Sequence, residues 1–152
     1  MKERSKLRTY ITLKHKLERE TYLELRDRYG APELTKIRGG SNRLRIESGR
    51  YQKIPRELRL CEVCTTGQVE DESHFMLECP LYDDFRKALW GRFESMLKIN
   101  RNEISKEEQL NILIGDGCKE NPEYDSLLKI VMKFIKQAMR RRQRQLEQGM
   151  VN

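Results

Sequence analysis

The chain has 152 residues, of which 37% are hydrophobic and 36% are charged, and its formal net charge at pH 7 is +7. This length predicts one domain with helical appendages, and the small hydrophobic fraction predicts a modest core that a metal site would help to stabilise. The sequence has no signal peptide and no run near the roughly 20 apolar residues that cross a bilayer, so we expect no membrane partner. We expect an intracellular protein, nuclear or cytoplasmic, whose clustered cysteines bind metal instead of forming disulfides.

The charge is unevenly distributed along the chain. Residues 1–60 carry 17 basic and 8 acidic side chains, whereas residues 61–84 carry seven acidic side chains and no basic one. Residues 126–152 carry seven basic side chains against the single Glu147. This uneven distribution indicates which segments could bind a polyanion, because basic segments attract polyanions and acidic segments repel them.

The first half of the chain begins with apolar residues at roughly helical spacing. They predict a long charged helix over residues 4–29, ended by Gly30, so residues 1–30 are taken as a helical N-terminal segment. A short helix then runs from Pro32 to Ile37. Residues 41–60 are ambiguous between a helical turn and an extended segment.

The second half predicts three further helices. One starts at Pro80, one follows the capping box from Ser105 to Glu108, and the last starts at Asn121 and ends in a run of arginines. We therefore predict a mostly α fold, with a small helical domain over residues 31–146 and a tail over 147–152. A Cys-Cys-His-Cys zinc knuckle at residues 59–80 would hold this domain together, between the long N-terminal helix and the basic C-terminal helix.

Four residues have the spacing of a zinc site. They follow the pattern Cys61-x2-Cys64-x9-His74-x4-Cys79. A Cys-x2-Cys pair turns both thiolates toward one ion, and four N/S ligands complete the tetrahedral shell of a structural zinc. We therefore predict one structural Zn²⁺ per chain, with no open coordination position for a substrate.

The segment between His74 and Cys79 sets a condition on the local backbone. Asp71 or Ser73 can cap a short helix that carries His74. His74 and Cys79 are five residues apart, which is about 140° around an ideal α-helix. We expect the helix to break before Cys79, and Pro80 favours this because it disfavours helical backbone at the residue before it.

Three segments carry a resemblance to a known family: residues 45–51 (RIESGRY), 59–64 (RLCEVC) and 70–84 (EDESHFMLECPLYDD). Together they resemble the zinc-binding region of reverse transcriptase, which follows the polymerase in non-LTR (LINE-type) retrotransposon proteins. The resemblance is strong over residues 43–90 and weaker over 33–42 and 105–143. It implies an accessory module that holds template RNA or target DNA near a polymerase, without polymerase activity in this chain.

The sequence contains no recognised catalytic motif. It has no Gly-x-Ser-x-Gly, no His-Glu-x-x-His and no phosphate-binding Gly-x4-Gly-Lys, so we do not expect an enzyme. The segment Leu81-Tyr-Asp-Asp84 differs in register from the polymerase Tyr-x-Asp-Asp and is taken as coincidental.

The expected partner is nucleic acid, RNA or DNA, bound by basic residues that flank the knuckle. Tyr51 among them is expected to stack on an unpaired base. The acidic knuckle should repel a polyanion and act as a clamp between its flanks. Two alternatives remain open: these arginines pair internally, or the protein is a zinc-held helical interaction module that binds a protein through its acidic loop or apolar helix faces. The candidate contacts are Arg38, Arg43, Arg45, Arg50, Tyr51, Lys53, Arg56, Arg59, Arg140, Arg141, Arg142 and Arg144.

Overall fold

The computed structural model describes residues 7–14, 16, 18–24 and 30–149. Over these residues the chain is mostly helical and has no β-strand, which confirms the fold class; one antiparallel bridge joins Leu60 to Val69. The main helices are α1 (Arg8–Leu13), α2 (Gly30–Gly39), α3 (Arg45–Tyr51), α4 (Asp83–Leu97), α5 (Lys106–Ile114) and α6 (Tyr124–Gly149). Short helical turns are η1 (Thr21–Leu23), η2 (Arg56–Leu58), η3 (His74–Glu78), η4 (Pro80–Tyr82) and η5 (Arg101–Glu103).

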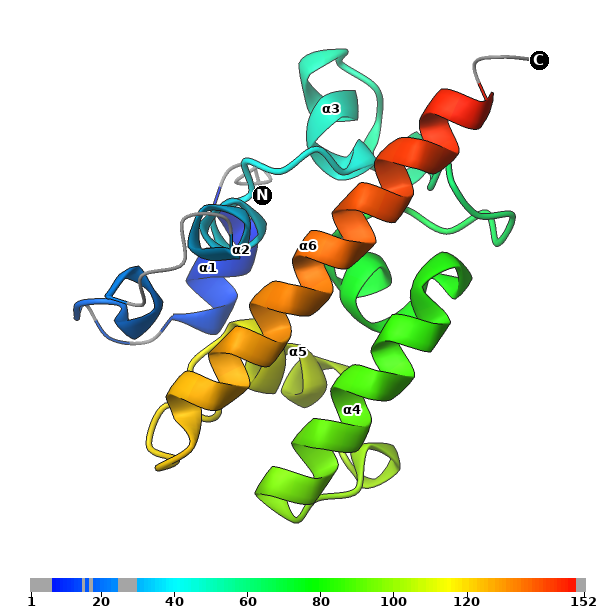
Figure 1. Cartoon of the computed structure of the whole chain (residues 1–152). Helices are drawn as coiled ribbons and strands as arrows, with labels where there is room; N and C mark the ends of the chain where they lie inside the picture. Colours follow the sequence, from blue (N-terminus) through cyan, green and yellow to red (C-terminus); the bar gives the residue numbers. More distant parts are fainter. Residues whose placement is uncertain (1–6, 15, 17, 25–29, 150–152) are drawn as a thin grey trace.

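Helix α6 is the element against which most of the others pack. Its 26 residues span about 39 Å at 1.5 Å per residue. Val131, Met132, Ile135 and Ala138 are almost fully buried and recur at the three- and four-residue spacing of one helical face. In Figure 1, α6 runs diagonally across the molecule, with α4 on one side of it and α2 on the other.

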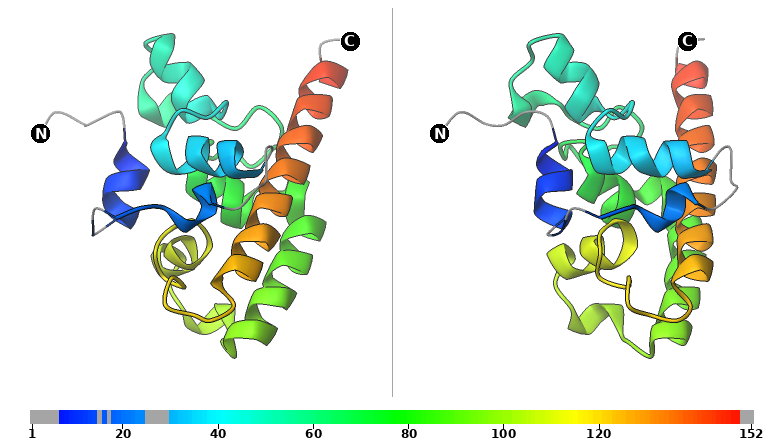
Figure 2. Two further views of the ribbon diagram at one scale, coloured as in Figure 1. Left: turned by 60° about the vertical axis from the view of Figure 1, so that its left-hand side comes forward. Right: turned by 90° about the vertical axis from the view of Figure 1, so that its left-hand side faces the viewer.

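Helix α4 lies antiparallel beside α6, as the two views of Figure 2 also show. It buries Leu89, Trp90 and Phe93, and the Trp90 and Phe93 ring centroids are 6.0 Å apart in an edge-on arrangement. Trp90 is therefore a core residue. Helix α5 begins at the predicted cap, where the Glu108 backbone N–H donates to Ser105 Oγ at 3.1 Å.

The long N-terminal helix predicted over residues 4–29 is wrong for the residues that the structure describes. Helix α1 ends at Leu13, since Lys14 has extended backbone angles, and residues 18–20 are not helical. Lys14 Nζ lies 2.7 Å from Glu20 Oε1 in a buried ion pair. Residues six apart lie about 120° apart around an α-helix, so this pair requires the helix to end. Residues 4–6, 15, 17 and 25–29 of the prediction lie outside the described residues.

Residues 41–60, left open by the sequence, form α3 and the turn η2. A Cβ on Gly49 of α3 would lie only 2.7 Å from Arg59 Cγ, so glycine permits this close approach. Across that contact Arg59 donates from Nε to the Ile54 carbonyl at 2.8 Å and from Nη1 to the Ile46 carbonyl at 3.1 Å. Arg59 thus joins α3 to the start of the knuckle.

None of the helices among the described residues is both long enough and apolar enough to cross a membrane.

Candidate metal centre

The four residues singled out by their spacing come together in the structure. The ligand atoms of Cys61, Cys64, His74 and Cys79 all lie within 4.8 Å of one another. An ion about 2.3 Å from each sulfur would place tetrahedral ligands about 3.8 Å apart, which this cluster allows. Cys79 and His74 are almost fully buried, Cys61 is 8% exposed and Cys64 is partly exposed. The cluster can hold a metal ion and exposes only one edge to solvent.

A short hairpin presents the first two cysteines. The Cys61 backbone N–H donates to the Gln68 carbonyl at 2.8 Å, and the Glu70 N–H donates to the Arg59 carbonyl at 3.0 Å. Between these bonds the chain turns at Gly67, whose φ of 70° is a left-handed value that glycine adopts without strain. The hairpin places both thiols on the side that faces η3.

The turn η3 presents the other two donors. Its start is fixed by Asp71, whose Oδ1 accepts the His74 backbone N–H at 2.9 Å, so of the two predicted caps the structure selects this one. The helix ends before Cys79, which has extended backbone angles as predicted. The turn is a π-helix, closed by the Cys79 N–H donating to the His74 carbonyl at 2.7 Å. This five-residue hydrogen bond brings the two ligands together, a solution that the sequence did not predict.

A side chain outside the ligand set orients the imidazole. His74 Nδ1 lies 2.8 Å from Gln68 Oε1, while Nε2 lies 3.4 Å from Cys64 Sγ. The amide oxygen can only accept, so Nδ1 carries the proton and Nε2 faces the sulfurs as the ligand atom. Sequence reasoning missed Gln68, because nothing in the nine-residue spacer distinguishes it from its neighbours. Thr66, also outside the ligand set, contacts another ligand: its Oγ1 lies 3.1 Å from Cys64 Sγ.

The thiols are coupled to one another. A hydrogen bond to Cys79, together with burial, raises the pKa of Cys61 to about 12. The same bond lowers the pKa of Cys79, which therefore has the greater thiolate character. Burial lowers the pKa of His74, but its hydrogen bonds to Cys61 and Cys64 outweigh this and raise it overall. A metal ion that binds here must displace the proton that Cys61 retains.

Arg86 of α4 holds the π-turn from behind. Its buried guanidinium donates to the Met76 carbonyl at 3.0 Å and to the Cys79 carbonyl at 2.9 Å, and it pairs with Asp83. Burial lowers the pKa of Arg86, although Asp83 opposes that shift. Sequence reasoning missed this residue, because an arginine in an amphipathic helix usually faces solvent. Its position explains how Cys79 is fixed relative to α4.

Arg142 of α6 holds the hairpin from the other side. Its Nε lies 2.7 Å from Glu70 Oε1 and its Nη2 lies 2.8 Å from Glu70 Oε2, a two-pronged pair in which both residues are buried. Glu70 also accepts the Arg45 backbone N–H at 2.7 Å. The pair joins the knuckle to the longest helix across 72 residues of sequence.

The acidic run around the knuckle is partly buried within the fold. Glu70 and Glu72 are buried, and Glu72 accepts from Asn42 Nδ2 at 3.0 Å. Asp71 caps His74, and Asp84 Oδ2 accepts from Arg141 Nη2 at 3.0 Å. Glu70 and Glu72 are therefore internal partners of the fold, whereas the side chains of Glu62, Asp83 and Asp84 stay 46%, 59% and 61% exposed.

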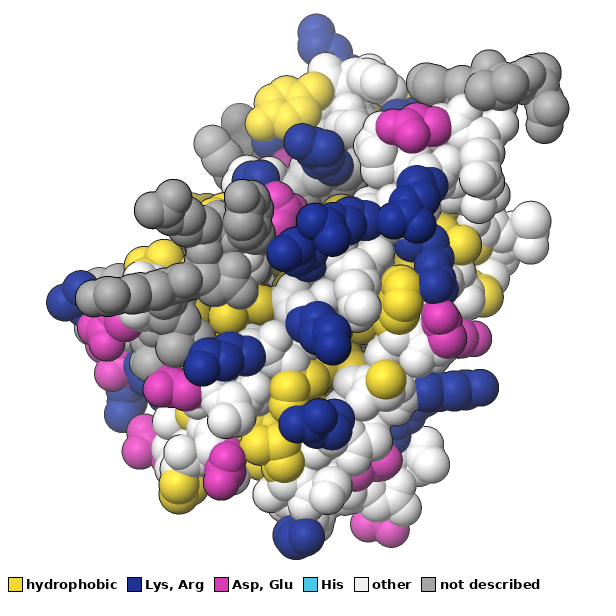
Figure 3. All heavy atoms as spheres, viewed as in Figure 1, with side chains coloured by type: hydrophobic (Ala, Val, Ile, Leu, Met, Phe, Trp, Pro, Cys, Tyr) yellow, Lys and Arg dark blue, Asp and Glu magenta, His cyan; other side chains and the backbone are white. Residues whose placement is uncertain are grey.

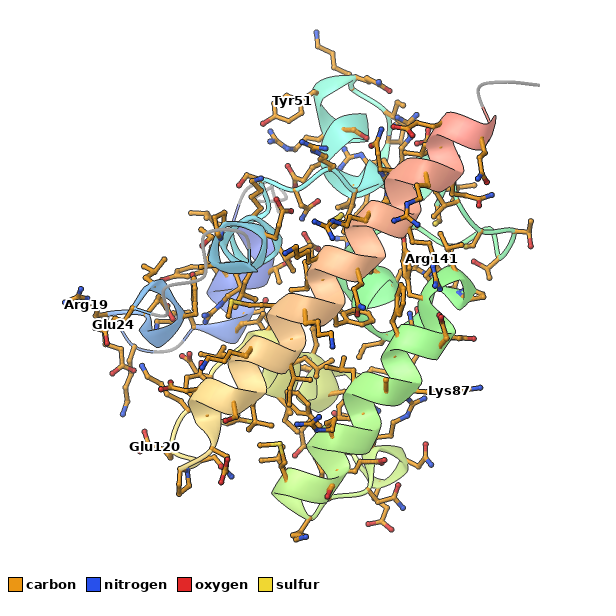
Figure 4. The ribbon with its side chains drawn as sticks, in the orientation of Figure 1. Arg19, Glu24, Tyr51, Lys87, Glu120 and Arg141 are labelled. Atoms are coloured by element: carbon orange, nitrogen blue, oxygen red, sulfur yellow. The ribbon has the colours of Figure 1, made fainter. Side chains whose placement is uncertain are left out.

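Several of the predicted nucleic-acid contacts are occupied within the protein. Arg38 and Arg142 are buried and ion-paired, Arg38 with Glu20 at 3.0 Å, so the prediction that they contact nucleic acid does not fit. In five other candidates the guanidinium group pairs with a carboxylate or a backbone carbonyl of the protein. Figure 4 shows Arg141, one of these, beside the start of α4. The five are Arg45 with Glu62 at 3.4 Å, Arg50 with Glu47 at 3.0 Å, Arg56 with Asp71 at 3.8 Å, Arg59 with backbone carbonyls, and Arg141 with Asp84.

The remaining candidates are free to contact a ligand. Arg43, Lys53, Arg140 and Arg144 are exposed, and none has an ion pair or hydrogen bond with a side chain in the part of the chain that the structure describes. Tyr51 is 70% exposed at the tip of α3 (Figure 4), with the Arg50 guanidinium 4.4 Å from its ring centre.

Sequence reasoning missed three lysines of α6. Lys129, Lys133 and Lys136 continue the positions of Arg140 and Arg144 at spacings of four, three, four and four residues. These five residues, which we term the α6 ridge, fall within about 80° of arc on the helix and lie away from its buried stripe. Figure 3 shows Lys and Arg side chains gathered over α6 on this face of the molecule. The regular spacing of these cations in the sequence could have predicted that they share one face of the helix.

Comparisons with known proteins give no match: no family model, no curated protein and no solved structure is similar to this chain.

Loss of a cluster residue should unfold the knuckle. Structural zinc sites contribute roughly 10–16 kcal/mol of apparent binding energy, comparable to the roughly 5–15 kcal/mol stability of a whole domain. Cys64→Ser or His74→Ala should therefore prevent the protein from retaining metal. The knuckle should then be unfolded from the start, so circular dichroism recorded during heating should show no cooperative transition for it. The control is Cys118→Ala, a buried cysteine outside the cluster, which should cost about 1 kcal/mol. Equal effects of all three changes would contradict the assignment.

The Glu70–Arg142 pair should show strong coupling. Arg142→Met leaves a buried carboxylate without its cation and should cost about 3–5 kcal/mol in urea unfolding. Glu70→Gln combined with Arg142→Met should cost clearly less than the sum of the single changes. Arg144→Met, an exposed position on the same helix, should change stability by about 0.5 kcal/mol or less. Additive single effects would show that the pair does not join the knuckle to α6.

Proposed function

We propose that the four-residue cluster binds one structural Zn²⁺ and that the protein is a non-catalytic module that binds nucleic acid, RNA or DNA. Three thiolates and one imidazole favour zinc among the common divalent ions, because calcium and magnesium prefer oxygen ligands. Four protein donors fill a tetrahedral shell, so no position is left at which a substrate or water would be activated. The ion would act by fixing the hairpin against the π-turn.

The observation that carries the nucleic-acid proposal is the α6 ridge. Its five cations lie within 16 residues and extend over about 22 Å of helix, with no acidic side chain between Lys129 and Arg144. One strand of duplex DNA carries a phosphate about every 3.4 Å along its axis, so the ridge faces several phosphates at once. Lys129, Lys133, Arg140 and Arg144 have no carboxylate partner among the described residues. Their charges are therefore available to a polyanion.

The metal cluster would support this ridge indirectly. The Glu70–Arg142 pair ties the knuckle to the C-terminal half of α6, and Arg141 pairs with Asp84 just beyond Cys79. Both arginines belong to the same helical turn as Arg140. Zinc binding would thus hold the ridge in place without touching the ligand, which is the clamp role expected from the sequence.

An accessory module that holds nucleic acid is also what the resemblance of residues 43–90 to the zinc-binding region of reverse transcriptase implies. The resemblance rests on the residues quoted above, and it adds to the proposal a place beside a polymerase of a retroelement. We also propose a nuclear or cytoplasmic location, where a nucleic-acid partner and reduced thiols coincide.

One observation favours the alternative, a protein-interaction module. A groove of about 350 Å³ between α4 and α6 is lined by five apolar and three polar or charged side chains: Phe85, Ala88, Leu89, Ile130 and Phe134, with Arg92, Lys133 and Gln137. The acidic loop gives no comparable support, because its buried carboxylates already have partners. A saturable protein partner that is unaffected by added nucleic acid would favour the groove over the ridge.

The salt dependence of binding tests the proposed function. Each neutralised phosphate contributes about −0.9 to the log–log salt slope on duplex DNA and about −0.7 on a single strand. Lys129→Gln with Lys133→Gln should therefore flatten the slope by about 1.8 on duplex and about 1.4 on single strands. Fluorescence anisotropy of a labelled oligonucleotide across salt concentrations measures both slope and affinity.

The matched control changes two cations of α4 and its end. Lys87 and Lys98 are exposed, and Figure 4 shows Lys87 directed away from α6. Lys87→Gln with Lys98→Gln alters net charge by the same amount and should leave the slope unchanged. If both double variants flatten the slope equally, binding depends on net charge alone and the ridge is not the contact surface. If the wild-type protein binds no oligonucleotide at low salt, the nucleic-acid proposal fails.

A further inference from the structure

A hollow of about 280 Å³ lies between α2 and α6, beside the α6 ridge. Its lining comes from three places: Glu33 on α2, Arg43 in the segment before α3, and Lys136, Met139, Arg140 and Gln143 on α6, together with Arg142. The space is large enough for a small polar group and bound water.

Only some of the charged side chains that line this hollow are available to bind a ligand, because others already have a partner of opposite charge. Arg142 is bound at two atoms by Glu70, and Glu33 is paired with Lys36 at 2.8 Å, so these two residues contribute little net charge. Arg43 and Arg140 are exposed and have no carboxylate partner among the described residues. Lys136 also lines the hollow, so two guanidinium groups from separate segments and one ammonium group make its potential positive.

We infer that this hollow binds a terminal phosphate, a phosphate monoester at the end of a nucleic-acid strand, between Arg43 and Arg140. The inference rests on the proposed function and adds to it recognition of strand ends. Guanidinium groups bind phosphate oxygens through paired N–H donors, which lysine cannot do. The ridge lysines, in contrast, act as point charges along a strand.

The shape of the hollow explains why a terminal phosphate fits better than an internal one. An internal phosphodiester has one negative charge and two sugar substituents, so it suits the convex ridge. A terminal monoester has one substituent and close to two negative charges at pH 7, its second pKa being about 6. It can enter a concave site and interact with both arginines. Lys136 and the remaining ridge would then follow the strand away from its end.

The test compares ends of one oligonucleotide. A single-stranded 12-mer is prepared with a 5′-phosphate, a 3′-phosphate or hydroxyl groups at both ends, and its affinity is measured by competition. We expect one phosphorylated form to bind about tenfold more tightly than the hydroxyl form. Arg43→Gln should abolish that difference without altering thermal unfolding, because Arg43 has no side-chain partner among the described residues. Arg92→Gln is the matched control and should leave the difference intact.

The outcomes separate the two proposals. If all three oligonucleotides bind equally with the expected salt slope, the terminal-phosphate site is wrong and the ridge stands. Inorganic phosphate and a nucleoside monophosphate are titrated separately, followed by ³¹P NMR. If they bind and Arg43→Gln prevents it, while no oligonucleotide binds, the hollow takes a free phosphate monoester and the nucleic-acid proposal fails. If neither oligonucleotides nor free phosphates bind, the inference is overturned.

Discussion

The architecture depends on holding three sulfur atoms and one imidazole within 4.8 Å of one another in a largely buried place. Without an ion, four polar groups are withdrawn from water and share few hydrogen bonds, which is costly. A hydrogen bond to Cys79 and then burial raise the pKa of Cys61, so its thiol keeps a proton when no ion is bound. An ion that replaces this proton would bind all four groups and so constrain the hairpin and the π-turn together.

The surrounding fold distributes that constraint. Arg86 carries it from the π-turn to α4, and Arg142 carries it from the hairpin to α6. Both arginines are buried and both use several donors, so each leaves unsatisfied acceptors if it is removed. Helices α4 and α6 also pack on each other. The metal cluster is therefore linked to two helices that are themselves in contact, and not to one helix alone.

The parts of this structure that could be predicted from the sequence are those fixed by local spacing. The cysteine and histidine pattern, the end of the helix before Cys79 and the apolar stripe of α6 each involve residues close in the chain. The partners of charged residues could not be predicted in the same way. Arg142 and Glu70 are 72 residues apart, and the pairing of Lys14 with Glu20 decides the end of α1 against its helical periodicity. Gln68 has no signal in the sequence, whereas the lysine spacing along α6 was readable and was missed.

The sequence also does not distinguish arginines that are buried in ion pairs from arginines that are exposed. A count of basic residues treats all of them as available, but burial and ion pairing remove Arg38 and Arg142 and leave Arg43 and Arg140 free. The proposed contact surface is therefore narrower than the sequence suggested, and it lies on one helix and one adjoining segment.

The metal content and coordination of the purified, reduced protein test the proposed zinc site. Elemental analysis combined with X-ray absorption at the zinc edge measures both. We predict about one zinc per chain, bound by three sulfur atoms at about 2.3 Å and one nitrogen at about 2.0–2.1 Å. A folded, reduced protein that contains no zinc, or zinc bound mainly by oxygen, would contradict it.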